Sequence, residues 1–301
     1  MSTLPGQVSI REVALRDGLQ IEAPIPLSAK LELLAAIAAT GVREVEVTSF
    51  VSPTKVPALA DAAEFAAELW RYPDIEFSAL VASTGGAARA VAAGLKSIEY
   101  VVCASDSFST RNVGRVTAEA VAAITDIAGI AHEAGATVEV IIATAWDCPF
   151  DGPTQPGRVS DIAASAAAFG VDRLAIADTI GTATPKRVTD LIAAVQPLIG
   201  DIPLGAHFHN TRGSGLACAY AAVQAGVTRL DASAGGLGGC PFAPGATGNI
   251  ATEDLVYLLG DCGIDTGIDL DAAITAAGVA STLVGHSLPS ALLAAGDRKR
   301  D

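Results

Sequence analysis

The sequence lacks the features that mark membrane, secreted and zinc-ribbon proteins. None of its apolar runs reaches the roughly eighteen residues that cross a bilayer, and the N-terminal residues MSTLPGQVSI lack the basic-then-apolar order of a secretory signal. The five cysteines are scattered and form no CxxC pair, which argues against a disulfide framework or a zinc knuckle. We therefore expect a cytoplasmic protein that neither enters a membrane nor depends on disulfides.

Positive charge is also scarce, and this shortage limits the partners of the protein. Lysine and arginine total 19 against 33 aspartates and glutamates, which gives a net charge of −14 at pH 7. Nucleic-acid surfaces need clustered Lys and Arg, so we expect no nucleic-acid partner. An anionic substrate would need a local group of cations or a metal ion to offset the negative background.

Only 5% of the residues are aromatic, whereas alanine and glycine are abundant. Short β-rich runs alternate with longer Ala/Leu-rich stretches, and runs such as YVVCA are apolar throughout, as parallel strands buried on both faces should be. We expect strands at 8–15, 43–50, 76–82, 97–104, 137–145, 173–179, 203–209 and 229–234. We expect helices at 28–40, 60–71, 84–93, 116–134, 157–169, 185–199, 213–225 and 249–259.

Glycines mark the ends of most expected helices, where the chain usually leaves the helix through a residue with positive φ. They are Gly41, Gly94, Gly135, Gly170, Gly200 and Gly226. No GxGxxG follows the first strand, which argues against a dinucleotide-binding Rossmann sheet. Eight strand–helix units instead predict an α/β fold, a (β/α)8 TIM barrel, as a single domain. The barrel should span about 7–263 and a short C-terminal helical appendage about 264–301.

Polar side chains gather where the expected strands end, and in such barrels this rim carries the active site. The residues on this rim are Arg16, Asp17 and Gln20, Glu46, Thr48 and Ser49, the segment 105–112, Asp178 and Thr179, His207 and His209, and Cys240 and Asn249. Simpler explanations stay open for some of them. Arg16 and Asp17 could form a plain ion pair, and Glu46 could be an interior carboxylate bonded to an arginine. Asp178 could only orient its neighbours.

Two histidines suggest a metal site. His207 and His209 are two residues apart on an expected strand, so their side chains project from the same face. Asp17 and Asn249 at other strand ends would add oxygen ligands, and this mixed set suits Mg²⁺ or Mn²⁺, with Zn²⁺ or Co²⁺ as alternatives. The competing explanation is one interior histidine held by a carboxylate, with an incidental neighbour.

The loop GGLGGCPFAPGATGN, residues 235–249, has six glycines and two prolines around a single cysteine. Glycine content alone is typical of a flexible surface connection. Next to a ligand site, however, such a loop could carry Cys240 over a substrate as a lid, where the thiol would act as a proton donor or base.

Five motifs stand in order along the chain. They are RDGLQ (16–20), EVTSFVSPTKVPALAD (46–61), ADTIGTATP (177–185), HFHNTRG (207–213) and GGLGGCPFAPGATGNIATEDLVYLL (235–259). On these motifs the sequence resembles the 3-hydroxy-3-methylglutaryl-CoA lyase family of the DRE-TIM metallolyase superfamily, from about Val8 to Thr266. Leu19 after RDG and the GGCP loop match the lyases, whereas condensing synthases usually have glutamate, alanine or asparagine after RDG.

The resemblance implies a role for each motif residue. The implied metal ligands are Asp17, His207, His209 and Asn249. Catalytic roles fall to Arg16, Asp17, Glu46, His207 and Cys240, with Glu46 ordering the site and Cys240 as a mobile thiol. Substrate contacts would come from Arg16, Gln20, Ser49, Thr179 and Arg212.

The implied activity is a metal-dependent cleavage of 3-hydroxy-3-methylglutaryl-CoA to acetyl-CoA and acetoacetate. An acyl-CoA thioester is then the partner, and a homodimer is expected because barrels of this family are often dimeric. Leucine breakdown is one pathway that such an activity would serve. A catalytically inactive barrel that acts as a scaffold is the alternative from another class of function.

Two departures leave the acyl group open. Where the lyases usually read HDTYG, this chain has HNTRG, so Asn210 and Arg212 replace an acid and an aromatic residue. Trp146 and Asp147, just before the family's Cys-Pro, also differ. A related lyase for a longer 3-substituted glutaryl-CoA or for citramalyl-CoA therefore stays as the alternative.

Overall fold

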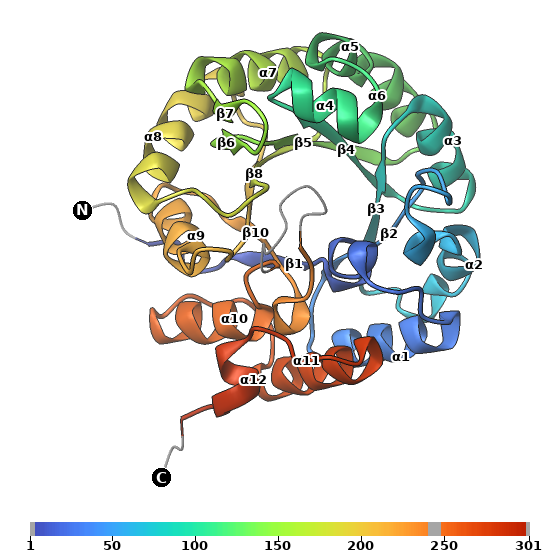
Figure 1. Ribbon diagram of the computed structural model, residues 1–301, viewed down its shortest axis with the longest axis vertical. Coiled ribbons are helices and arrows are strands. Elements are labelled where there is room, and N and C mark those ends of the chain that lie inside the picture. Colours follow the sequence, from blue (N-terminus) through green and yellow to red (C-terminus); the bar gives the residue numbers. More distant parts are fainter. Residues whose placement is uncertain (1–3, 240–247, 299–301) are drawn as a thin grey trace.

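Eight parallel strands close into a barrel ringed by helices (Figure 1) in the computed structural model, which describes residues 4–239 and 248–298. The barrel strands are β1 (Ser9–Glu12), β2 (Glu44–Ser49), β3 (Glu76–Val81), β4 (Ser97–Cys103), β5 (Thr137–Ala143), β8 (Arg173–Asp178), β9 (Leu204–Phe208) and β10 (Arg229–Ala232). They follow one another around the barrel in chain order, and β10 closes it by pairing with β1. The predicted (β/α)8 barrel is confirmed.

Helices separate the strands along the chain and surround the barrel. They are α1 (Leu27–Ala38), α2 (Ala62–Ala66), α3 (Thr84–Ala92), α4 (Asp106–Val113), α5 (Thr117–Ala122), α6 (Ile124–Glu133), α7 (Pro156–Ala168), α8 (Pro185–Val195), α9 (Gly215–Gln224) and α10 (Thr252–Asp261). Short turns complete the set: η1 (Ala14–Gly18), η2 (Leu19–Ile21), η3 (Pro57–Leu59), η4 (Leu69–Arg71), η5 (Gln196–Leu198) and η6 (Ala234–Gly236). All six glycines expected at helix ends have positive φ.

The structure corrects several expected boundaries. The first strand ends at Glu12, three residues early, because the chain turns into the π-helical segment η1. The single helix expected at 116–134 is divided into α5 and α6, and residues 106–113, expected only as a rim segment, form α4. A small hairpin of β6 (Asp147–Cys148) and β7 (Gly152–Pro153) follows β5.

Two further helices follow the barrel, as the sequence predicts. α11 (Leu270–Val284) packs against α1 and η6, and α12 (Ala291–Ala295) packs against α10 and α11. The two helices lie outside the ring beside α10 and α1 (Figure 1). Within the described residues, no helix is long and apolar enough to cross a membrane.

The barrel interior has a charged layer below a small apolar one. Arg11 is buried and forms ion pairs with three buried carboxylates, those of Glu99, Glu139 and Asp231. Above them, a separate apolar cluster is formed by Val101, Ile141, Ala175 and Ala177. Val101 and Ile141 follow Glu99 and Glu139 by two residues along β4 and β5, towards the C-terminal ends of these strands. The cluster therefore stands between the charged layer and the rim.

Candidate active site and metal centre

The turn after β1 brings Arg16 and Asp17 over the mouth of the barrel. The carboxylate of Glu12 accepts a hydrogen bond from the backbone N–H of Ala14 and another from that of Ala234, each at 2.9 Å. These bonds end the strand and hold the start of η1 against η6. Single π-helical turns occur often at functional sites, and this one buries both charged side chains.

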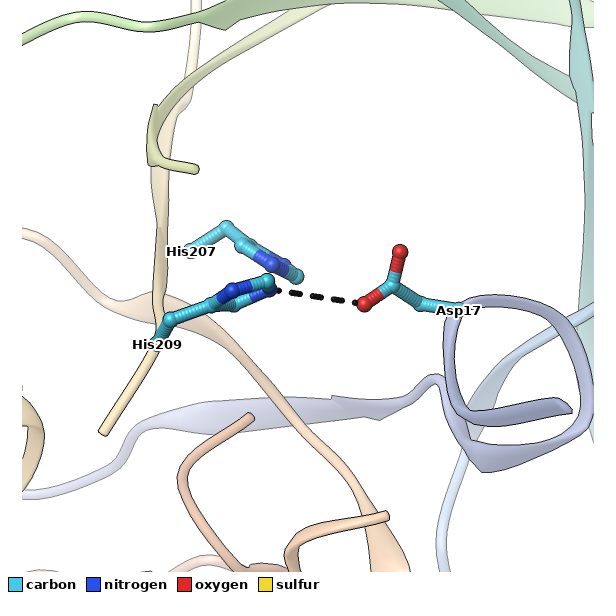
Figure 2. A group of neighbouring side chains, drawn as sticks. All are labelled: Asp17, His207 and His209. Atoms are coloured by element: carbon cyan, nitrogen blue, oxygen red, sulfur yellow. Dashed lines mark ion pairs between the residues drawn. The ribbon is translucent and has the colours of Figure 1, made fainter. Parts of the chain in front are cut away.

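Asp17, His207 and His209 form a buried cluster (Figure 2). One ligand atom from each lies within 4.8 Å of the others. The Nε2 atom of His209 is 3.5 Å from Oδ2 of Asp17, and the two imidazole rings are 5.1 Å apart between centroids. Both histidines come from β9 and its end, whereas Asp17 comes from η1, so the barrel closure is what brings them together.

A carboxylate below the cluster holds one of the two histidines. Nδ1 of His207 lies 3.1 Å from Oδ2 of Asp231, which is itself paired with Arg11. A carboxylate can only accept, so Nδ1 of His207 donates the proton and Nε2 is left as a lone-pair donor atom. The buried Nδ1 of His209, in contrast, has no hydrogen-bond partner within the described part of the chain.

Asn249 stands beside the cluster. Its Nδ2 donates to Oδ2 of Asp17 at 2.8 Å and to the carbonyl of Leu237 at 3.1 Å. Its Oδ1 is buried without a hydrogen-bond partner among the described residues. An orphaned amide oxygen next to a carboxylate and two imidazoles is a donor set that suits a divalent ion. The residues present therefore fit the metal that the sequence suggests.

Arg16 contacts two carboxylates at 2.6 Å, Asp17 through Nη1 and Glu46 through Nε. The plain ion pair that the sequence left open is thus present, and so is the interior carboxylate bonded to an arginine. Burial disfavours the charged form of Asp17, but Arg16 and the two histidines outweigh this effect and hold the Asp17 pKa well below its usual range.

Glu46 is fully buried, and the pKa of its carboxyl is raised well above the usual value. Burial is the main cause of the raised pKa. The charge of Arg16 lowers the pKa in part, and the neighbouring carboxyl of Glu99 raises it further.

A cavity of about 750 Å³ opens above the cluster. Seven residues predicted from sequence line it, namely Arg16, Asp17, Gln20, Ser49, Thr179, His207 and His209. Towards the rim the lining includes four further cations, Lys55, Arg89, Arg111 and Arg115. Among the described lining residues, Asp17 is the one carboxylate, so the cavity is a positive region in an acidic protein.

Arg212 is not brought into this cavity. Its exposed side chain donates through Nη1 to the carbonyls of Ile180 and Gly181, at 2.8 and 3.1 Å. The neighbouring Asn210 accepts from the N–H of Gly215 at the start of α9. The two unusual residues of HNTRG therefore stabilise loops, and the structure gives no support to substrate contact by Arg212.

Other candidates have structural partners. Asp178 accepts from the backbone N–H groups of Thr182 and Ala183, so it orients the loop after β8. Asp147 accepts from Arg187 and Thr182, and Trp146 is buried. Cys240 lies outside the described residues. Its neighbour Gly239 lines the cavity.

Several residues at the site were missed from sequence. Arg11, Glu12 and Asp231 support the site from inside the barrel. Of the rim cations, Arg89 and Arg115 lie outside every motif, whereas Lys55 lies in the motif at 46–61 and Arg111 in the rim segment 105–112. Side-chain alternation was the available signal, because Asp231 lies within the expected strand 229–234, on its inward face. Nothing in the sequence signals Thr144, which has a φ of 55° just after β5 and whose N–H donates to Oγ1 of Thr179.

The family model described as HMGL-like matches residues 7–279. The chain therefore belongs to this family, and the protein is a carbon–carbon lyase. The family resemblance inferred from the motifs is confirmed.

Three relatives are similar over nearly the whole chain. The (R)-citramalyl-CoA lyase of Chloroflexus aurantiacus is 40% identical over 300 residues, covering 96% of this chain and 95% of that protein. The hydroxymethylglutaryl-CoA lyase of Bacillus subtilis is 35% identical and covers 95% and 96%. The structure of an HMG-CoA lyase from Acinetobacter baumannii, in complex with coenzyme A and 3-methylmalate, has a TM-score of 0.94 and 37% identity, and covers 100% and 99%.

Proposed function

We propose that this protein is a divalent-metal-dependent lyase that cleaves 3-hydroxy-3-methylglutaryl-CoA to acetyl-CoA and acetoacetate. The observation that carries the proposal is the buried cluster of Asp17, His207 and His209 beside Arg16, at the base of a cavity lined by cations. Hydroxymethylglutaryl-CoA lyases among the relatives support the same substrate.

The reaction breaks the bond between the carbinol carbon and the methylene next to the thioester carbonyl. The hydroxyl loses its proton and becomes the ketone of acetoacetate, while the electron pair of the broken bond forms the enolate of acetyl-CoA. The side chains of Asp17, His207, His209 and Asn249 would hold a divalent ion, which would lower the pKa of the substrate hydroxyl and orient the substrate. Asp17 lines the cavity base, where its carboxylate can accept the hydroxyl proton.

Arg16 stabilises the enolate oxygen that forms in this step. Its guanidinium is permanently charged, and two carboxylates 2.6 Å away hold its plane. A preorganised charge of this kind needs no rearrangement as the oxyanion develops. Cys240, on the segment that follows the cavity-lining Gly239, donates the proton that completes acetyl-CoA.

The rim cations accommodate the coenzyme A part of the substrate. Lys55, Arg89 and Arg111 are exposed at the mouth of the cavity, and Arg115 is half-buried there. Phosphate groups bind Arg and Lys by charge-assisted hydrogen bonds. This arrangement meets the need for a local positive region in a chain with a net charge of −14.

A second candidate substrate is citramalyl-CoA, in which the carboxylate is attached directly to the carbinol carbon. The 40% identity to an (R)-citramalyl-CoA lyase motivates it. Beside His207 the cavity wall consists of small or apolar side chains, Val101, Ile141, Ala143 and Ala177. Because these four side chains carry no charge, they do not distinguish the two substrates by the position of the carboxylate. The two substrates then differ at the site chiefly by the volume of one methylene.

A substrate panel tests the proposal. Acetyl-CoA release is measured with Mg²⁺ or Mn²⁺ for 3-hydroxy-3-methylglutaryl-CoA, longer 3-alkyl analogues and both citramalyl-CoA enantiomers. We expect kcat/KM for 3-hydroxy-3-methylglutaryl-CoA to exceed the others by at least about tenfold, the usual discrimination for one methylene. A higher value for a citramalyl-CoA, with pyruvate as co-product, would establish the second candidate. A protein that binds no divalent ion would support the scaffold alternative.

A homodimer and a cytoplasmic location belong to the same proposal, because both come from the family resemblance and the sequence. Sedimentation equilibrium of the purified protein tests the dimer. A monomer at all concentrations would rule it out.

A further inference from the structure

Hydrogen bonds and ion pairs continue from the Asp17, His207 and His209 cluster into the barrel interior. Nδ1 of His207 meets Oδ2 of Asp231 at 3.1 Å. Arg11 donates two parallel hydrogen bonds of 2.9 Å to the same carboxylate, from Nε to Oδ1 and from Nη2 to Oδ2. The side chains of His207, Asp231 and Arg11 are each less than one-tenth exposed. Solvent therefore has little access to these bonds.

Arg11 is itself fixed by two more carboxylates. Its Nη1 lies 2.5 Å from Glu139 and 2.8 Å from Glu99. Glu139 in turn pairs with Arg229 at 3.0 Å, and Arg229 with Glu44 at 2.8 Å. We call this series, from Asp231 through Arg11, Glu139 and Arg229 to Glu44, the interior charge series. It runs away from the cavity along the barrel.

This arrangement restricts Asp231 more than a single contact would. Two parallel bonds from a planar guanidinium fix both the position and the plane of a carboxylate. A carboxylate paired with Arg11 in this way accepts the hydrogen bond from Nδ1 of His207.

The two histidines differ in this respect. His209 has an unpartnered Nδ1 among the described residues, whereas His207 has a fixed acceptor. In metal sites, a partner on the second ring nitrogen fixes the tautomer and the ring plane of a histidine ligand.

We propose that Asp231, held by Arg11, is a positioning residue that sets the tautomer and orientation of His207 as a metal ligand. The inference rests on the metal site in the proposed function. Asp231 keeps the proton on Nδ1 and directs the lone pair of Nε2 toward Asp17 and His209. His209 depends on other contacts, so the two ligands are not equivalent.

Metal affinity tests this role without an acyl-CoA. Mn²⁺ binding to the metal-free full-length protein is measured by isothermal titration calorimetry and by the EPR signal of free Mn²⁺. We expect Asp231→Asn to raise the Kd for Mn²⁺ roughly 10–100-fold, and the matched control Glu139→Gln to change it by less than about threefold. Both changes remove one negative charge from the partners of Arg11, but only Asp231 touches His207.

Two results would overturn the inference. One is an unchanged Kd in Asp231→Asn, and the other is an equal rise in both variants, which would mean a merely structural role of the interior charge series. A wild-type protein that does not bind Mn²⁺ would remove the proposed metal site as well.

The tautomer can also be observed without any change at Asp231. Histidine-selective ¹⁵N NMR of the metal-free wild type, assigned with His207→Gln, distinguishes the two ring nitrogens. We expect Nδ1 of His207 to have the shift of a protonated nitrogen and Nε2 that of an unprotonated one. The reverse pattern would refute the role of Asp231 even if the variants fail to fold.

Discussion

Arg16 is the residue whose contacts tie the proposed chemistry to the fold most closely. It bridges Asp17, which belongs to the metal cluster, and Glu46, which is buried in β2. Removing its charge leaves the enolate without its counterion, so we expect Arg16→Gln to keep the fold but to lower kcat about 10²–10³-fold. Steady-state kinetics with circular dichroism check this prediction.

Arg212 supplies the matched control for that experiment. Its side chain is exposed and held by the carbonyls of Ile180 and Gly181, outside the cavity lining. Arg212→Gln should therefore retain kcat within about threefold, since removal of charge stabilisation at the reacting centre is what costs orders of magnitude. An equal loss in both variants would contradict a specific role of Arg16.

Cys240 carries the second prediction at this scale. If its thiol supplies the proton to the acetyl-CoA carbon, Cys240→Ala should lower kcat about 10²-fold or more, the usual contribution of a general acid. The exposed Cys262 at the end of α10 provides the control. Near-wild-type turnover in Cys240→Ala would remove this residue from the mechanism.

Some site residues could be predicted from short sequence motifs, and others could not. The RDGLQ and HFHNTRG motifs carry their own spacing, which is why Asp17, His207 and His209 could be predicted from sequence. Asp231 and Arg11 were missed, because they pair with each other across 220 residues of sequence and neither belongs to a motif that marks its role. Arg212 lies outside the cavity lining because two backbone carbonyls engage its guanidinium, which sequence alone does not show.

At the scale of elements, the order of strands and helices was predictable because it depends on local patterns. Apolar runs alternate with Ala-rich stretches, and the six helix-ending glycines adopt the positive φ expected of them. The boundary of β1 was not predictable, because the strand ends where the Glu12 side chain accepts hydrogen bonds from Ala14 and from the distant Ala234. Val13, Ala14 and Leu15 have strand character in sequence, yet the Glu12 carboxylate draws the N–H of Ala14 into a turn.

Glu12 joins three elements around the site, η1, η6 and α10. Besides the N–H groups of Ala14 and Ala234, it accepts from the hydroxyl of Thr252 at 2.6 Å, at the start of α10. Asp17 lies just after the first of these contacts and Asn249 just before the last. One buried carboxylate therefore fixes the spacing between a proposed metal ligand on η1 and another before α10.

For the molecule as a whole, buried carboxyl groups determine how stability depends on pH. Glu253, at the start of α10, accepts from the N–H of Gly235 near Glu12. Burial raises the pKa of the Glu12 carboxyl and that of the Glu253 carboxyl from 4.5 to about 7. At pH values between 4.5 and about 7, the folded protein therefore binds more protons than the unfolded chain. Stability therefore falls as pH rises from about 4.5 to about 7.

We accordingly expect the free energy of unfolding to fall between pH 5 and pH 8, and Glu253→Gln to reduce that fall by about 1–2 kcal/mol. The glutamine cannot ionise, so it no longer carries the cost of a buried charge above pH 7. Urea denaturation at pH 5, 6, 7 and 8 measures the effect. Glu133→Gln, at an exposed glutamate in α6, should leave the pH dependence as in the wild type. If Glu253→Gln kept the full fall, the buried carboxyl would already be ionised at pH 5 and the proposed proton uptake would be wrong.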